Sequence, residues 1–179
     1  MFSLGLVSVS AAQAQDCPKA PNHIAAVDAL LAQVREAKND RSARVYGAQL
    51  WALWADAPDE PAQELLDAGM EKLRYGDFLG AIQTLDRLIA YCPEYAEGYN
   101  QRAYVNFLRK DFAAALPDLD RAIALSPNHV AAISGKGLTL IGLGRKVEAR
   151  QMLEQAVALN PWLSERHLLE MMKAEEQEL

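Results

Sequence analysis

Residues 128–161 read NHVAAISGKGLTLIGLGRKVEARQMLEQAVALNP, and this stretch decides the fold of the chain. It ends at Pro161, and two further prolines, Pro127 and Pro93, precede it at equal intervals along the chain. The residues between the prolines repeat one pattern of apolar and small side chains. Self-similarity at a period of about 20–50 residues is typical of helical repeats, in which stacked copies build one continuous core.

Two kinds of position recur at this spacing, and each has a physical reason. Small side chains recur where two helices must approach closely, and a turn residue, mostly glycine, recurs between them. The equivalent sets are Gly69, Ala103 and Gly137 in the first helix, Gly76, Lys110 and Gly144 at the turn, and Ala81, Ala115 and Ala149 followed by Leu85, Leu119 and Leu153 in the second helix. The pattern predicts antiparallel helix pairs joined by short loops.

These residues resemble the tetratricopeptide repeat, whose signature is a small residue at the first helix crossing, alanine at the second and proline at the end. The resemblance covers three contiguous copies between residues 62 and 161. It implies an all-α fold, a right-handed superhelical array of antiparallel helix pairs, over residues 59–161. It also implies that the first helices of successive pairs line a concave groove, which receives a peptide or a helix of a partner.

The segments before the repeats are expected to form a lead-in and a hairpin. Residues 15–21 contain two prolines and predict an extended lead-in. Residues 22–58 carry apolar side chains at spacings of three and four, which predicts a helical hairpin. The repeat register places Trp51 and Trp54 on leucine positions. The hairpin therefore resembles a degenerate extra repeat. Because Arg35 occupies its small-residue position and Asp59 its proline position, it is expected to pack with altered geometry. Both tryptophans are expected in the core against the helix that follows, and the alternative is a ligand-stacking platform.

Residues 162–179 are expected to form a C-terminal capping helix, from about Leu163 to Glu178. Its apolar side chains fall on one side of the helix and its glutamates elsewhere. One stripe would cover the last helix pair while the other face meets water. In a short array, such a helix can also fold back over the groove.

Residues 1–14 carry no charge and differ from the rest of the chain. An apolar run followed by Ala12-Gln13-Ala14 is typical of a secretory signal peptide cleaved after Ala14, although no Lys or Arg precedes the run. The alternative is a frayed apolar N-terminus of a cytosolic protein. The signal predicts a periplasmic or secreted protein, and the run is too short to span a bilayer.

The chain has two cysteines, Cys17 and Cys92, without CxxC spacing. In an oxidising compartment the two thiols could form a disulfide, which would tie the lead-in to the repeats. The sequence leaves a disulfide and two free thiols as open alternatives. No redox or metal role is expected, because no histidine cluster accompanies the thiols.

Charge and motifs exclude several functional classes. The 24 acidic and 18 basic residues give a net charge of −6, and no run of Lys and Arg occurs, which disfavours nucleic acid and anionic lipid as partners. The histidines, His23, His129 and His167, fall in different helices and are expected to be exposed or to cap helix ends. No HExxH, GxSxG or catalytic Cys/His pair occurs, so no enzymatic activity, cofactor or metal site is predicted.

The predicted functional surface is the concave groove. Its expected lining residues are Leu66, Met70, Arg74, Asn100, Gln101, Tyr104, Phe107 and Leu138. A flexible thioether and aromatic rings suit an amphipathic helix or an apolar peptide. The alternative is that the apolar members Leu66, Met70, Tyr104 and Phe107 are packing residues buried beneath the capping helix.

One binding mode of the family is not expected here. Co-chaperone members hold a C-terminal carboxylate with a cluster of Lys, Asn and Arg side chains. The corresponding positions in this chain are Leu66, Met70, Gln101, Ala131 and Gly135. Because none of them carries a positive charge, we expect no carboxylate binding of this kind.

The sequence as a whole favours a non-enzymatic scaffold or adaptor that binds a protein or peptide partner in the cell envelope. The alternative is that the same groove holds a small apolar ligand, as an accessory of a carrier system. Self-association is a further expectation, because repeat arrays present apolar end faces.

Overall fold

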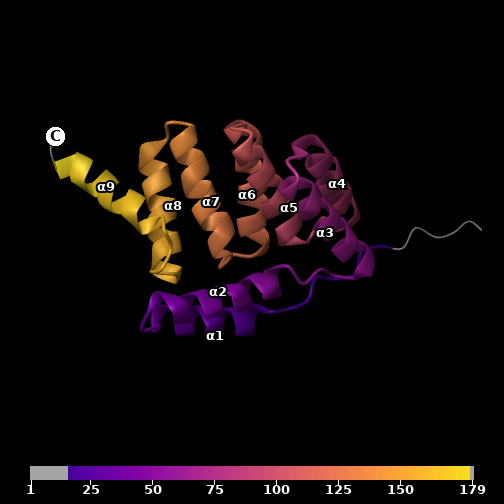
Figure 1. The fold of residues 1–179 in the computed structure, drawn as a ribbon, viewed down its shortest axis with the longest axis horizontal. Coiled ribbons are helices and arrows are strands. Elements are labelled where there is room, and N and C mark those ends of the chain that lie inside the picture. The colour runs from indigo at the N-terminus through magenta and orange to yellow at the C-terminus, as the bar shows by residue number, and fades with distance from the viewer. Residues whose placement is uncertain (1–15, 178–179) are drawn as a thin grey trace, which may run out of the picture.

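The computed structural model describes residues 16–177, and this part of the chain contains helices and no strands. The helices are α1 (Ile24–Arg35), α2 (Asp40–Trp54), α3 (Glu60–Arg74), α4 (Phe78–Tyr91), α5 (Ala96–Leu108), α6 (Phe112–Leu125), α7 (Val130–Gly142), α8 (Lys146–Leu159) and α9 (Arg166–Gln177). Helices α3 to α8 stand side by side as three consecutive antiparallel pairs (Figure 1), which confirms the predicted all-α array. The expected signal, residues 1–14, lies outside the described residues.

Each pair closes at the predicted small residues. A Cβ atom added to Gly69 would lie 2.9 Å from the Leu85 side chain, and one added to Gly137 would lie 2.7 Å from the Leu153 side chain. Ala103 occupies the equivalent position in α5 and is fully buried. Larger side chains at these crossings would force the two helices apart, because the helices are already in contact.

The turns inside the three pairs share a left-handed backbone conformation. Gly76 has a φ angle of 78°, Gly144 one of 73°, and Lys110 one of 62°. Glycine adopts this conformation at no steric cost, so the glycines follow from the turn geometry. Lys110 occupies the same turn with a side chain, which shows that the fold imposes this conformation on whatever residue is present.

Ion pairs join successive helix pairs at equivalent positions. Arg102 in α5 contacts Asp86 in α4 at 2.7 Å, and Lys136 in α7 contacts Asp120 in α6 at 2.7 Å. Arg102 also donates hydrogen bonds of 2.6 and 2.8 Å to Asp118, and these raise the pKa of its guanidinium further above its usual value. Both partners of the second ion pair lie one repeat after those of the first, so the sequence period also sets the ionic contacts between pairs.

The N-terminal hairpin of α1 and α2 does not stack on α3 as an extra repeat would. Figure 1 places it beneath the array, lying across the ends of the paired helices. Its core residues Val27, Leu31 and Leu50 form one apolar cluster with Val130, at the start of α7, and with Trp162. The hairpin therefore packs with a different geometry from that of a stacked repeat, because its apolar stripe is covered by the edge of the array.

The two tryptophans of α2 follow this altered placement. Trp54 stacks on His129, with ring centroids 4.3 Å apart and ring planes 15° apart. The backbone oxygen of Trp54 accepts a 3.0 Å hydrogen bond from Tyr95, and burial raises the pKa of that hydroxyl well above its usual value. Trp51 lines a cavity of the array. For Trp54 the prediction of packing against the next helix is wrong, because the hairpin crosses the array instead of extending it.

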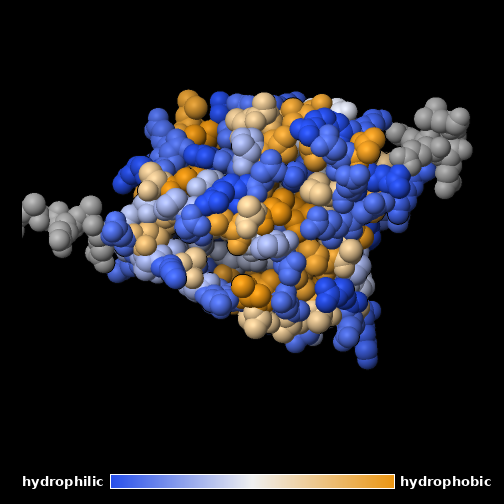
Figure 2. Space-filling view, turned by 180° about the vertical axis from the view of Figure 1, so that it is seen from behind, coloured by the Kyte–Doolittle hydropathy of each residue, from blue (hydrophilic) through white to orange (hydrophobic). Residues whose placement is uncertain are grey.

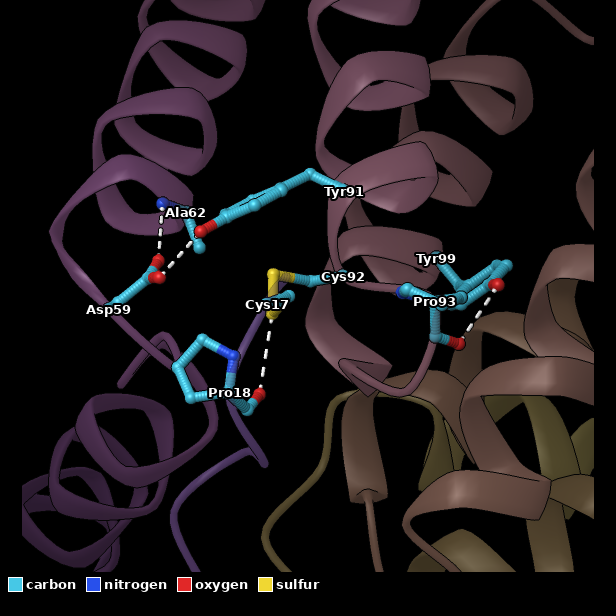
Figure 3. Close-up of a disulfide and its surroundings, with 8 residues drawn as sticks. All are labelled: Cys17, Pro18, Asp59, Ala62, Tyr91, Cys92, Pro93 and Tyr99. Carbon is cyan, nitrogen blue, oxygen red and sulfur yellow. Dashed lines mark hydrogen bonds between the residues drawn. A yellow bond between two sulfur atoms is a disulfide. The ribbon is translucent and has the colours of Figure 1, made fainter. Parts of the chain in front are cut away.

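The lead-in is fixed to the first pair by a disulfide between Cys17 and Cys92, drawn in Figure 3. The two Cα atoms lie 5.2 Å apart across a sequence separation of 75 residues. Beside the bond, Tyr91 donates a 2.7 Å hydrogen bond to Asp59, whose other carboxylate oxygen accepts from the Ala62 amide and caps α3. The loop closed by the disulfide contains the whole hairpin of α1 and α2. The chain before the hairpin and the chain after it are therefore both fixed to the first helix pair.

Helix α9 begins at Arg166, after the predicted start at Leu163, and diverges from the array in Figure 1. It packs against α8 through Leu169, which is buried, while Met171 is 56% exposed. Met171 follows Gly137 by one full repeat and so occupies the small position of the pattern. Because a methionine cannot enter this close crossing, α9 does not continue the array. None of the described helices is long and apolar enough to cross a membrane.

Removing the disulfide should lower the stability of the fold. Replacing Cys17 and Cys92 with serine opens a loop closed over 75 residues, for which the chain-entropy model gives a loss of about 4 kcal/mol. Urea unfolding followed by far-ultraviolet circular dichroism measures the free energy of unfolding. The reduced wild-type protein should match the double variant. Equal stability of the oxidised protein and the double variant would contradict the prediction.

Candidate functional site

A cavity of about 330 Å³ opens between α5 and α7, the first helices of the second and third pairs. Several parts of the chain form it. Tyr104 and Phe107 come from α5 and Leu138 from α7, while Trp51 comes from α2 and Leu163 from the segment before α9. Its lining is mostly apolar and, among the described residues, includes no Lys or Arg. Figure 2 shows apolar side chains reaching the surface between hydrophilic ones, on the array and on the hairpin below it.

Five of the eight predicted groove residues meet at this cavity. They are Asn100, Gln101, Tyr104, Phe107 and Leu138. Tyr104 is 50% exposed, so the alternative of burial beneath the capping helix is wrong for this residue. Phe107 packs its ring on Phe112, with centroids 5.5 Å apart. That these residues bind a partner stays a prediction.

The other three predicted residues lie elsewhere. Leu66 is fully buried in the core of the first pair, so its placement in the groove was wrong. Its side of α3 packs against Leu85 and Leu88 of α4 instead of facing the groove. Met70 and Arg74 line a separate depression formed by α3 alone. The site is therefore confined to α5 and α7 and the segments that border them.

A buried carboxylate organises the polar wall of the cavity. Glu97, in the first turn of α5, is fully buried. Its Oε1 atom accepts hydrogen bonds of 3.1 Å from Asn100 Nδ2 and 2.6 Å from Gln101 Nε2. Its Oε2 atom lies 2.7 Å from His129 Nε2. Because His129 is the N-cap residue of α7, this network joins the two helices that enclose the cavity.

His129 caps α7, one of the two roles predicted for it, but it is fully buried and not exposed. Its Nδ1 atom accepts a 3.3 Å hydrogen bond from the Ala132 amide. A ring nitrogen that accepts carries no hydrogen, so Nε2 carries it and donates to Glu97. Trp54 covers the ring and seals the pair from solvent. A sealed carboxylate–imidazole pair cannot reach a substrate, so its role is structural.

Sequence reasoning did not predict the contact between Glu97 and His129. The available signal was an acidic residue and a histidine, both at predicted starts of first helices and nearly one repeat apart. Residues separated by about one repeat are neighbours along the edge of an array, so Glu97 and His129 were bound to lie close together.

The buried carboxylate fixes the orientation of both amides beside it. An ionised carboxylate accepts hydrogen bonds and donates none, so the amide nitrogens of Asn100 and Gln101 face Glu97. The opposite atoms, Asn100 Oδ1 and Gln101 Oε1, form no hydrogen bond within the described part of the chain. Both residues line the cavity.

The facing wall carries the one charged group among the described lining residues, Glu165. Its carboxylate accepts hydrogen bonds of 2.8 Å from Ser134 Oγ and 3.0 Å from Ser164 Oγ. Thr139, also in the lining, is fully buried, and its hydroxyl has no hydrogen-bond partner in the described structure. No three His, Cys, Asp or Glu side chains of the described residues converge where a metal ion could bind.

Comparison with known proteins finds a match to one family model and to several solved structures. Residues 107–165 match the family model described as tetratricopeptide repeat. The first such domain of Spaghetti (RPAP3), bound to the HSP90 peptide SRMEEVD, is similar with a TM-score of 0.62 and 25% identity, covering 65% of this chain and 93% of that chain. The chain has the tetratricopeptide repeat fold.

Two further solved structures share the tetratricopeptide repeat fold with this chain. The TPR2B domain of yeast Sti1, in a complex with pHsp70, has a TM-score of 0.57 and 26% identity, covering 65% of this chain and 97% of that chain. The Sgt2 domain from Aspergillus fumigatus has a TM-score of 0.63 and 18% identity, covering 67% and 82%. A search of curated protein sequences finds no significant match.

Replacing Glu97 with alanine should destabilise this tetratricopeptide repeat fold. The change leaves the donors of Asn100, Gln101 and His129 buried without their acceptor, at a cost of about 2–4 kcal/mol in the free energy of unfolding. Urea unfolding measures the loss. Glu71→Ala, at an exposed position of α3, is the matched control and should change stability by less than about 0.5 kcal/mol. Similar values for both variants would contradict the structural role of Glu97.

Proposed function

We propose that this protein is a non-enzymatic adaptor that binds a peptide or helix of a protein partner in the cavity between α5 and α7. The observation that carries the proposal is the cavity itself, an apolar space of about 330 Å³ in which Tyr104 is half exposed. Such concave apolar sites with a few placed polar groups are the usual form of binding sites. The similar RPAP3 and Sti1 domains are complexes with chaperone peptides or proteins, which supports peptide binding as the use of this fold.

The proposed partner is not an acidic chaperone tail. Two of the positions at which clamp-type relatives would hold a carboxylate, Ala131 and Gly135, line the cavity without any charge. A third, Gln101, is uncharged and directs an N–H of its amide to the carboxylate of Glu97. A carboxylate placed here would find no cation to balance its charge, so its loss of hydration would be uncompensated.

We also propose that the protein works in the periplasm or is secreted. The disulfide between Cys17 and Cys92 supports an oxidising compartment, because such bonds rarely persist in a reducing cytosol. The apolar residues 1–14, ending in Ala-Gln-Ala, support export through a signal peptide. Mass determination of the mature N-terminus from the native host tests this: a chain beginning at Gln15 supports export, and one beginning at Met1 contradicts it.

A small apolar ligand is the second candidate occupant of the cavity. The observation that favours it is the volume, since about 330 Å³ lies within the range of about 300–1,000 Å³ usual for small-molecule sites. Native mass spectrometry of the protein purified from its own host would detect such a ligand as an added mass that disappears on denaturation.

Truncating Tyr104 should remove partner binding while leaving the fold intact. Loss of an aromatic anchor at the centre of an interface costs about 2 kcal/mol or more, which is about thirtyfold in affinity. Proteins captured from an envelope extract by the wild-type chain should therefore be lost from Tyr104→Ala. Tyr75→Ala, at a tyrosine that is 78% exposed and does not line the cavity, is the matched control and should capture the wild-type set. Identical captured proteins from all three chains would contradict the proposed site.

A further inference from the structure

We propose that the cavity takes an arginine side chain of the partner peptide, held between hydrogen-bond acceptors and aromatic rings. The inference rests on the proposed function, because it names the chemistry of the segment that the same cavity binds. It reverses the charge preference of an acidic-tail site. Three independent features of the described residues carry it: the orientation of two amides, the charge of one carboxylate and the aromatic lining.

The amide wall selects for a donor. Glu97 is buried and accepts from Asn100 Nδ2 and Gln101 Nε2, so neither amide can flip without setting its oxygen against the carboxylate. Both residues line the cavity, so the Oδ1 and Oε1 atoms, on the opposite side of each amide from Glu97, are the acceptors that the proposed arginine would meet. A partner group that only accepts, such as a carboxylate, is repelled by these oxygens and finds no Lys or Arg among the described lining residues. A group that only donates, such as guanidinium, matches both atoms.

Glu165 adds a negative charge on the opposite wall. Each of its oxygens accepts one hydrogen bond from a serine hydroxyl, and a carboxylate has about four lone-pair sites. Capacity for further donors therefore remains. With no Lys or Arg among the described lining residues, this charge is not neutralised inside the cavity. Partial burial strengthens its attraction for a cation relative to that of an exposed carboxylate.

The apolar lining suits the rest of an arginine side chain. Trp51 and Tyr104 present aromatic rings to the cavity, on which a planar guanidinium can stack. Leu138 and Leu163 can cover its methylene stem, since long cationic side chains bury their stems against apolar surface. An ammonium group has three donors around a point charge, so lysine fits a site with flat rings and spread acceptors less well.

The charge of the whole chain acts in the same direction. The net charge of −6 attracts basic segments and repels acidic ones, which speeds encounter with a basic peptide at low salt.

The test selects peptides from a random phage-displayed library on the full, disulfide-bonded chain and retains those that Tyr104→Ala no longer binds. The expected result is that these peptides share one arginine, and that replacing it with glutamate abolishes binding. Glu165→Gln, which keeps the size and removes the charge, should weaken the selected peptide about tenfold. The selected peptide with its arginine replaced by norleucine should bind equally to the wild-type chain and to Glu165→Gln. Glu170→Gln, at an exposed position of α9 outside the cavity, is the matched control.

The outcomes separate the inference from the proposed function. Peptides that depend on Tyr104 but lack a shared arginine, carry lysine in its place, or bind Glu165→Gln as well as wild type overturn the arginine assignment and leave the peptide site standing. Failure to select any peptide that depends on Tyr104 overturns the proposed function as well. A shared arginine with loss on Glu165→Gln and no loss on Glu170→Gln supports both.

Discussion

The hydrogen bonds of one buried carboxylate hold together the parts of the molecule that meet at the cavity. Glu97 is fully buried in α5, and His129, the cap of α7, is fixed against it at 2.7 Å. Trp54 of the hairpin stacks on the same imidazole, so the hairpin is located by the contact that joins the two helices. Asn100 and Gln101 direct their donors to the carboxylate and turn their acceptors elsewhere. Packing, hairpin position and the polarity of the cavity wall therefore depend on a single ionisable group.

The repeat region could be predicted because its physical causes are local and periodic. A Cβ at Gly137 would meet Leu153 at 2.7 Å, and Gly144 turns with a φ of 73°, so small residues and glycines at a fixed spacing report helix crossings and turns directly. The same register gave the groove positions on α5 and α7. It failed at Leu66, because the register places a residue on a helix but does not say whether that face meets the groove or the neighbouring α4.

The hairpin could not be predicted because no periodic signal describes it. The apolar stripe of the hairpin was predicted correctly, but such a stripe indicates only that some other element packs against it. The partner is the edge of the array, where Val130 and Trp162 meet Leu31, and these contacts join segments far apart in the sequence. Asn128 hydrogen-bonds Asp28 across a separation of 100 residues at 2.8 Å. The sequence period favoured stacking on α3, and the disulfide at Cys92 together with the Trp54 stack on His129 favours the crossing instead.

The polarity of a repeat groove depends on buried residues that do not line the groove. The RPAP3 domain bound to the HSP90 peptide SRMEEVD shares its fold with this chain at 25% identity, so the same fold can present different side chains in its groove. In this chain, a buried glutamate beneath the wall decides which end of each amide is presented. An amide can serve as donor or acceptor with almost no change in shape, so the group behind it, and not the exposed side chain, determines which role it plays. To infer binding specificity in such arrays, one must therefore know the buried hydrogen-bond partners of the groove side chains. For Asn100 and Gln101, that partner is Glu97.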